Sequence, residues 1–176
     1  MQKNWYIIYT KPKSEKKVSL LLSKKKIENF LPLNLKEITS LRKKKACQEP
    51  LFKSYVFAYT DEGELEKIRE INGVLNVLYW KGQPAVIKRE EIQLMKDFLA
   101  DYHEVKVERT MVNAKNFARV TDGSKYSISG NVLSIKNTMV RVNLPSLGYS
   151  LFASVGTRHP LLSERAFANN NLLIES

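Results

Sequence analysis

Residues 51–60, LFKSYVFAYT, carry the clearest strand pattern in the chain. Aromatic residues alternate with small apolar ones, so Tyr55, Phe57 and Tyr59 fall on one face of the predicted strand. Any fold of this chain must therefore contain a sheet to which this segment belongs.

The first hundred residues add further strands and helices to this sheet. Strand patterns recur over residues 4–10, 74–80 and 28–41, the last broken at Pro32. Apolar residues at helical spacing predict helices over residues 15–26, 61–71 and 87–99. The segment SLRKKKACQEP (40–50) is expected to be an exposed basic hairpin tip or loop. The order β-α-β-β-β-α-β-α predicts an α+β domain over residues 1–102, with helices packed against an antiparallel sheet.

The rest of the chain has a different pattern, without a helix over residues 111–156. Short strands are predicted around residues 117–120, 128–135, 139–144 and 149–155. Turn signals separate them, which is typical of a small all-β barrel. Residues 103–110 are polar and lack periodicity, so we expect a linker there, and residues 157–176 are expected to form a C-terminal tail.

Basic residues are concentrated at the start of the chain. The net charge is +11, from 29 Lys and Arg against 18 Asp and Glu. Residues 1–60 carry 14 basic and 4 acidic side chains, whereas residues 61–102 carry 6 and 9, and residues 103–176 carry 9 and 5. A segregated field of this kind steers polyanions, so it predicts nucleic acid, or a complex containing it, as a partner. Lysines that only solvate the surface are the alternative.

Several classes of function are excluded by what the sequence lacks. Cys47 is the single cysteine, and together with His103 and His159 it is too few for a zinc site. The N-terminus has no signal-peptide pattern, and no segment approaches the roughly 20 apolar residues of a membrane span. No phosphate loop, dinucleotide-binding motif or nucleophile motif occurs. We therefore expect a cytoplasmic, monomeric binding protein that is not an enzyme and needs no cofactor or metal.

A set of short strings gives the chain a family resemblance. The strings are Trp5-Tyr6-Ile7-Ile8-Tyr9, a helix with Glu15, Phe30-Leu31-Pro32, Glu49-Pro50-Leu51-Phe52-x-x-Tyr55-Val56-Phe57, Gly73-Val74 and Gly82-x-Pro84-Ala85-x-Ile87. Together they resemble the N-terminal (NGN) domain of the NusG family of transcription elongation factors, over residues 4–100. The EPLF-x-x-Y-x-F and WY-x-x-Y strings are more similar to the specialised RfaH-like and UpxY-like antiterminators than to housekeeping NusG. The remainder resembles the KOW barrel of the family more weakly.

The resemblance implies a protein partner. In the family, the N-terminal domain lays a hydrophobic depression on the clamp helices of the RNA polymerase large subunit and holds the enzyme in a pause-resistant form. The positions that match this depression are Tyr9, Phe52, Tyr55, Phe57 and Trp80. Aromatic side chains dominate interface energetics, which agrees with this role, and ordinary core packing is the alternative. For Trp5 we expect core packing.

The resemblance also implies contacts with nucleic acid. Five lysines would flank the exposed non-template strand and the upstream duplex, namely Lys11, Lys13, Lys17, Lys24 and Lys25. The basic tip would touch nucleic acid or polymerase through Arg42, Lys43, Lys44 and Lys45, or would only be solvated. The barrel would recruit NusE, the termination factor Rho or the ribosome. The barrel prediction does not exclude that this domain also refolds into a form that masks the polymerase site.

Three departures from the family pattern bear on function. The usual Pro-Gly or Pro-Asn between Phe52 and Tyr55 is Lys53-Ser54 here, so that turn is expected to differ. Glu64-Leu65-Glu66-Lys67 replaces a Thr-rich stretch, and Ile71 and Asn72 replace a base-reading Thr-Arg pair. The hypothesis is therefore a non-catalytic elongation or antitermination factor for selected operons, without a carried-over DNA element. The alternative is an RNA- or ribosome-binding module of the KOW type.

Overall fold

The computed structural model describes residues 2–40, 43–110, 126–128, 131–136 and 139–154. The chain forms two compact units. The first contains residues Met1–Leu33 and Glu49–Lys96, and the second contains Asn34–Gln48 and Asp97–Ser176. The fold is α+β with antiparallel sheets, as predicted.

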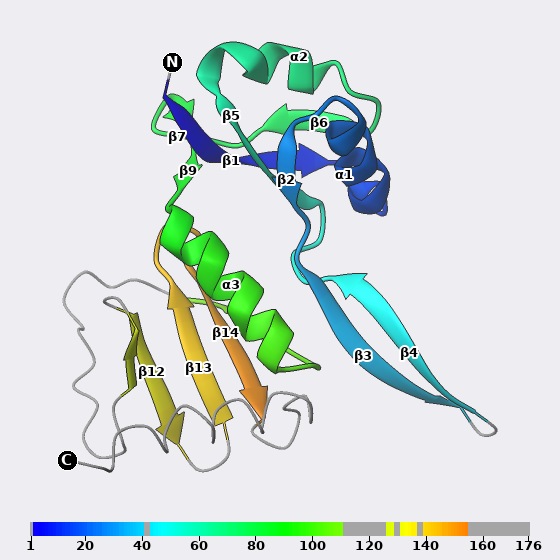
Figure 1. Ribbon diagram of the computed structural model, residues 1–176, viewed down its shortest axis with the longest axis vertical. Helices are drawn as coiled ribbons and strands as arrows, with labels where there is room; N and C mark the ends of the chain where they lie inside the picture. Colours follow the sequence, from blue (N-terminus) through cyan, green and yellow to red (C-terminus); the bar gives the residue numbers. More distant parts are fainter. Residues whose placement is uncertain (1, 41–42, 111–125, 129–130, 137–138, 155–176) are drawn as a thin grey trace, which may run out of the picture. The chain divides into compact units, whose positions relative to one another are not determined.

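The first unit is built on a five-stranded antiparallel sheet (Figure 1). The strands, in chain order, are β1 (Lys3–Thr10), β2 (Glu28–Phe30), β5 (Tyr55–Asp61), β6 (Val74–Val77) and β9 (Val86–Ile87). The spatial order is β2-β5-β1-β6, and β9 also pairs with β1. Strands β7 (Tyr79–Trp80) and β8 (Gln83–Pro84) form a separate two-stranded ladder. The predicted strand over 51–60 is therefore next to the centre of the sheet.

Two helices cover one face of this sheet (Figure 1). They are α1 (Glu15–Lys24) and α2 (Leu65–Arg69), which follows the short 3₁₀ helix η1 (Glu62–Glu64). Their apolar side chains close a core with the strand residues that point to the same face. Its buried members are Tyr6, Ile8, Val18, Leu22, Val56, Ala58, Leu65, Ile68, Ile71 and Val77. Helix α3 (Arg89–Asp101) begins in the first unit and ends in the second.

The second unit contains another five-stranded antiparallel sheet, in the order β10-β14-β13-β12-β11. Its strands are β10 (Lys106–Arg109), β11 (Tyr126–Ile128), β12 (Asn131–Lys136), β13 (Met139–Leu144) and β14 (Tyr149–Ser154). Alternate residues of β13 and β14 are buried, which gives the sheet one apolar face: Val140, Val142, Leu144, Leu151 and Ala153.

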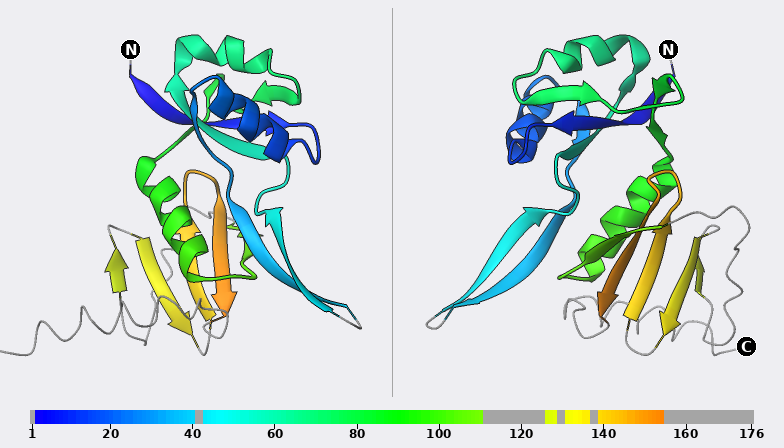
Figure 2. Two further views of the ribbon diagram at one scale, coloured as in Figure 1. Left: turned by 45° about the vertical axis from the view of Figure 1, so that its right-hand side comes forward. Right: turned by 180° about the vertical axis from the view of Figure 1, so that it is seen from behind.

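The second unit also holds most of the hairpin of β3 (Leu33–Ser40) and β4 (Lys43–Pro50), a long two-stranded ribbon (Figure 2). The amide side chain of Asn34 fixes its base. It donates from Nδ2 to the Val105 carbonyl at 2.7 Å and accepts from the Val105 N–H at 2.9 Å. The Glu104 N–H donates to the Leu35 carbonyl at 2.8 Å. Residues 43–50, expected within a hairpin tip or loop, form strand β4 of this ribbon.

Two segments differ from the sequence prediction. Strand β5 begins at Tyr55 rather than at residue 51, because residues 51–54 form a turn in which Ser54 has a φ of 65°. Residues 106–109, expected within a linker, form β10, and Val107 pairs with Leu151 of β14. The strand predicted at 117–120 and the tail over 157–176 lie outside the described residues, as does part of the expected barrel.

Candidate functional site

One face of the first sheet, opposite the face that α1 and α2 cover, is rich in aromatic residues. The β1–β5 register sets these residues opposite one another in three pairs: Trp5 with Tyr59, Ile7 with Phe57 and Tyr9 with Tyr55. Because side chains alternate along each strand, all three pairs share this face. The expected alternation of Tyr55, Phe57 and Tyr59 is thereby confirmed.

One end of this aromatic face is covered. Trp5 is only 3% exposed, and its ring lies 5.4 Å from the ring of Tyr59. The Lys96 ammonium of α3 lies 5.5 Å from the centroid of the Trp5 ring and 5.3 Å from that of Phe30. The expectation that Trp5 packs in the core is therefore confirmed.

The other end of the face exposes two tyrosines. Tyr9 is 40% exposed and Tyr55 is half-buried, and their rings meet edge to face at 5.9 Å. Phe57, the next residue of β5 on this face, is buried, as is Phe52 in the preceding turn, and the rings of Phe52 and Phe57 meet edge to face at 6.1 Å. We call these four residues the aromatic cluster. The structure brings four of the five expected polymerase-binding residues together: Tyr9 is exposed, Tyr55 is half-buried, and Phe52 and Phe57 are buried.

Trp80, the fifth expected residue, lies in β7 and is 72% exposed. Its neighbour Leu78 connects this segment to β1, because the Leu78 N–H donates to the Ile7 carbonyl at 2.8 Å. Among the described residues, the Trp80 ring contacts no other aromatic ring. Trp80 is therefore an isolated exposed aromatic residue on the same unit as the aromatic cluster.

The turn over residues 51–54 positions the aromatic cluster, and a buried carboxylate holds this turn. Glu15 is 5% exposed, and its Oε1 accepts a hydrogen bond from the Ser54 N–H at 2.7 Å. The Ser54 carbonyl accepts from the Thr10 N–H at 2.8 Å. Ser54 thus adopts the left-handed conformation that glycine or asparagine adopts most easily. Sequence reasoning missed this role of Glu15, since its partner is 39 residues away in the chain.

The five expected lysines of the N-terminal region are all exposed, on α1 or next to it. They are Lys11, Lys13, Lys17, Lys24 and Lys25. Helix α1 ends at Lys24, and Lys26 then takes a φ of 60° while the Ile27 N–H donates to the Leu22 carbonyl. Lys25 therefore follows the helix as an exposed cap residue.

Gly73 fixes the start of this lysine-rich segment. Its carbonyl accepts from the Lys11 N–H at 2.8 Å, and its φ is 101°. A Cβ at this position would lie 3.0 Å from Cγ2 of Val18 and 3.3 Å from Cβ of Ser14. Only glycine allows α1 to approach this closely.

The basic tip can be located only in part. Lys43, Lys44 and Lys45 lie at the start of β4, while their side chains, and all of Arg42, fall outside the described residues.

In the part of the chain that the structure describes, no three His, Cys, Asp or Glu residues are placed to hold a metal ion. None of the described helices is long and apolar enough to cross a membrane.

Comparisons with known proteins give the family. The family model described as "Transcription termination factor nusG" matches residues 3–96, more than half of the chain. No curated protein was found to match in sequence.

Two solved structures are similar to the chain. One is Thermotoga maritima NusG, from a structure concerned with its domain interaction, at 22% identity over 90% of this chain and 97% of that chain, with a TM-score of 0.48. The other is a chain of the MjSpt4:Spt5 complex in conformation A, at 14% identity over 88% of this chain and 96% of that chain, with a TM-score of 0.33. The sequence match over residues 3–96 decides the assignment: the chain belongs to the NusG family of transcription factors.

Proposed function

We propose that the protein is a non-catalytic elongation and antitermination factor that binds the clamp helices of RNA polymerase and contacts the exposed DNA of the transcription complex. It would act on selected operons, as the specialised RfaH-like and UpxY-like members of the family do. The observation that carries this proposal is the aromatic cluster, with exposed Tyr9 and half-buried Tyr55, on the sheet face opposite the lysine-bearing helix α1.

The exposure of the aromatic residues supports a protein partner. Tyr9, Tyr55 and Trp80 offer large rings at the surface, and such rings bind with little loss of side-chain entropy. Phe52 and Phe57 are buried and would act by holding the two tyrosines in place. An apolar surface of this kind is suited to the side chains of a helical partner.

The lysines support a nucleic-acid partner beside the protein partner. Lys11, Lys13 and Lys17 are exposed at the start of α1, and Lys24 and Lys25 at its end. Lysine binds phosphate as a point charge, so these residues would give salt-dependent affinity without reading the base sequence. The second unit would recruit a further partner, such as NusE, Rho or the ribosome.

Binding of the full chain to core RNA polymerase tests this function. The wild type is compared with Tyr55→Arg and with the triple variant Lys13→Ala, Lys17→Ala, Lys24→Ala, each with and without a DNA bubble. We expect Tyr55→Arg to weaken binding in both conditions, because a charge would enter the protein interface. The triple variant is expected to weaken binding only with the bubble, and less so at high salt.

Two results would contradict the proposal. Wild-type affinity in Tyr55→Arg, with its fold intact by circular dichroism, would remove the aromatic cluster from the interface. A chain that ignores polymerase but binds RNA through the same lysines would instead support the RNA- or ribosome-binding module.

A further inference from the structure

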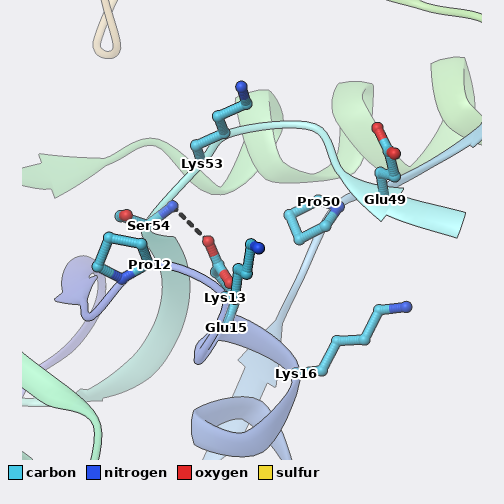
Figure 3. A pocket seen from close by; sticks show the side chains of 8 residues that line it. All are labelled: Pro12, Lys13, Glu15, Lys16, Glu49, Pro50, Lys53 and Ser54. Carbon is cyan, nitrogen blue, oxygen red and sulfur yellow. Dashed lines mark hydrogen bonds between the residues drawn. The ribbon is translucent and has the colours of Figure 1, made fainter.

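An open pocket of about 480 Å³ lies in the first unit, between the start of α1 and the turn that joins β4 to β5 (Figure 3). Three lysines line it from three segments: Lys13 precedes α1, Lys16 lies in its first turn and Lys53 lies in the turn after β4. All three side chains are exposed. Their side chains do not meet in Figure 3, but positive charges on separate segments around one pocket raise the local potential and favour an anion there.

The acidic side chains of the pocket cancel only part of this charge. Glu15 is almost completely buried, and its carboxylate accepts the Ser54 N–H, so it serves as part of the wall (Figure 3). The three lysines together with Glu15 and Glu49 leave the lining with a net charge of +1. Neither Lys13 nor Lys53 makes an ion pair within the described part of the chain. Their charges are therefore available to a ligand.

The backbone fixes these two lysines on either side of the opening. Lys13 has a φ of 64°, and Ser54, next to Lys53, has a φ of 65°. Each left-handed residue other than glycine costs about 1–2 kcal/mol, and such strain is concentrated at functional sites. The hydrogen bond from Ser54 to Glu15 joins the two segments across the pocket. The pocket is thus held in shape before any ligand binds.

We propose that this pocket binds a phosphate group, and that a nucleic-acid strand supplies it. Exposed Lys11 and Lys17 lie on the same segment as Lys13, so a strand seated in the pocket would continue along α1. Pro12 and Pro50 line the pocket with apolar ring surface, against which a sugar can pack. This inference rests on the proposed function and adds Lys16 and Lys53, which the sequence analysis did not assign, to its nucleic-acid surface.

The test measures binding of the full chain to a labelled single-stranded oligonucleotide across a range of salt concentrations. Lys53→Gln removes the charge, Lys53→Arg keeps it, and Lys67→Gln removes an exposed lysine on α2, outside the pocket. We expect Lys53→Gln to weaken binding and to lower the slope of log K against log salt by about 0.7, the value for one phosphate of a single strand. Lys53→Arg and Lys67→Gln are expected to keep the wild-type slope. Lys16→Gln provides an independent second variant, with the same expected loss as Lys53→Gln.

Each contrary result has a separate meaning. Equal salt slopes for Lys53→Gln and Lys67→Gln would overturn the proposal that the pocket binds a phosphate group. If the double variant Lys17→Ala, Lys24→Ala, which leaves the pocket lining intact, still lost affinity, the proposed function would nevertheless stand. A mononucleotide that binds as tightly as the oligonucleotide, with the same dependence on Lys53, would overturn the nucleic-acid strand as the source of the phosphate. Loss of polymerase binding in Lys53→Gln without DNA would place Lys53 in the protein interface instead.

Discussion

Gly73 illustrates how a single residue fixes the lysine-rich segment of the first unit. Its positive φ and its close contacts with Val18 and Ser14 exclude a side chain, and its carbonyl binds the Lys11 N–H. The sequence predicts a helix over residues 61–71, which ends just before this glycine. The contact with α1 could not be predicted, because it depends on how two segments more than 50 residues apart pack together.

Replacing Gly73 by alanine should lower the free energy of unfolding by about 1–3 kcal/mol because of backbone strain. The close contact between the new Cβ and Val18 should lower it further. Gly82→Ala is the matched control, because Gly82 also has a positive φ, of 81°, but a Cβ at this position would have no atom within 4 Å. Chemical denaturation measures both variants. Equal losses would show that the close approach to α1 contributes nothing to stability.

The aromatic residues show the extent and the limit of prediction from sequence at this scale. Strand alternation correctly set Tyr55 and Phe57 on one face, because the period of a strand is read directly from the residues. It could not distinguish the exposed Tyr9 from the buried Phe57, since burial depends on what covers the sheet. Position 54 likewise has a left-handed backbone conformation, although it is occupied by serine and not by the glycine or asparagine that would signal such a turn.

Among the elements, the β3–β4 hairpin depends on Asn34. This side chain is 3% exposed and satisfies both backbone groups of Val105, as a neighbouring strand would. Substitution by leucine would leave the N–H and the carbonyl of Val105 without these bonds. A buried polar group without a partner costs about 1–3 kcal/mol.

Asn34→Leu is therefore expected to destabilise the second unit and to speed amide hydrogen exchange at Val105 and Glu104. Asn72→Leu serves as the control, since Asn72 is exposed and the same substitution there should change neither quantity. Unchanged exchange at Val105 in Asn34→Leu would show that the hairpin base does not depend on this amide.

Elements with strong internal patterns were predicted well, and elements defined by their partners were not. Strands β13 and β14 match the predictions at 139–144 and 149–155 closely, because both have alternating apolar residues between clear turns. Strand β10 was missed, since KVER has little apolar content and is a strand only through its pairing with β14.

At the scale of the whole molecule, the chain divides differently from the simple order in the sequence. Residues 34–48 belong to the second unit, although they lie between strands of the first. Asn34 and Val105 are 71 residues apart, so no local pattern predicts their contact. The concentration of positive charge near the start of the chain, by contrast, was evident from the sequence. The lysines of α1 and its flanks, which contribute to this charge, are exposed in the first unit.

The central claim is that exposed aromatic residues of the first unit bind RNA polymerase, and Trp80 offers its most direct test. Because the Trp80 side chain is 72% exposed, it can be removed without opening the core. Leu20 is 57% exposed on α1, outside the aromatic cluster, and serves as an apolar control. The affinity of the full chain for core polymerase is measured for Trp80→Ala and Leu20→Ala. We expect Trp80→Ala to bind at least about tenfold more weakly, because a large exposed tryptophan ring that enters an interface is often among its energetically dominant residues, and Leu20→Ala to bind as the wild type. Equal affinities in all three proteins would contradict the account.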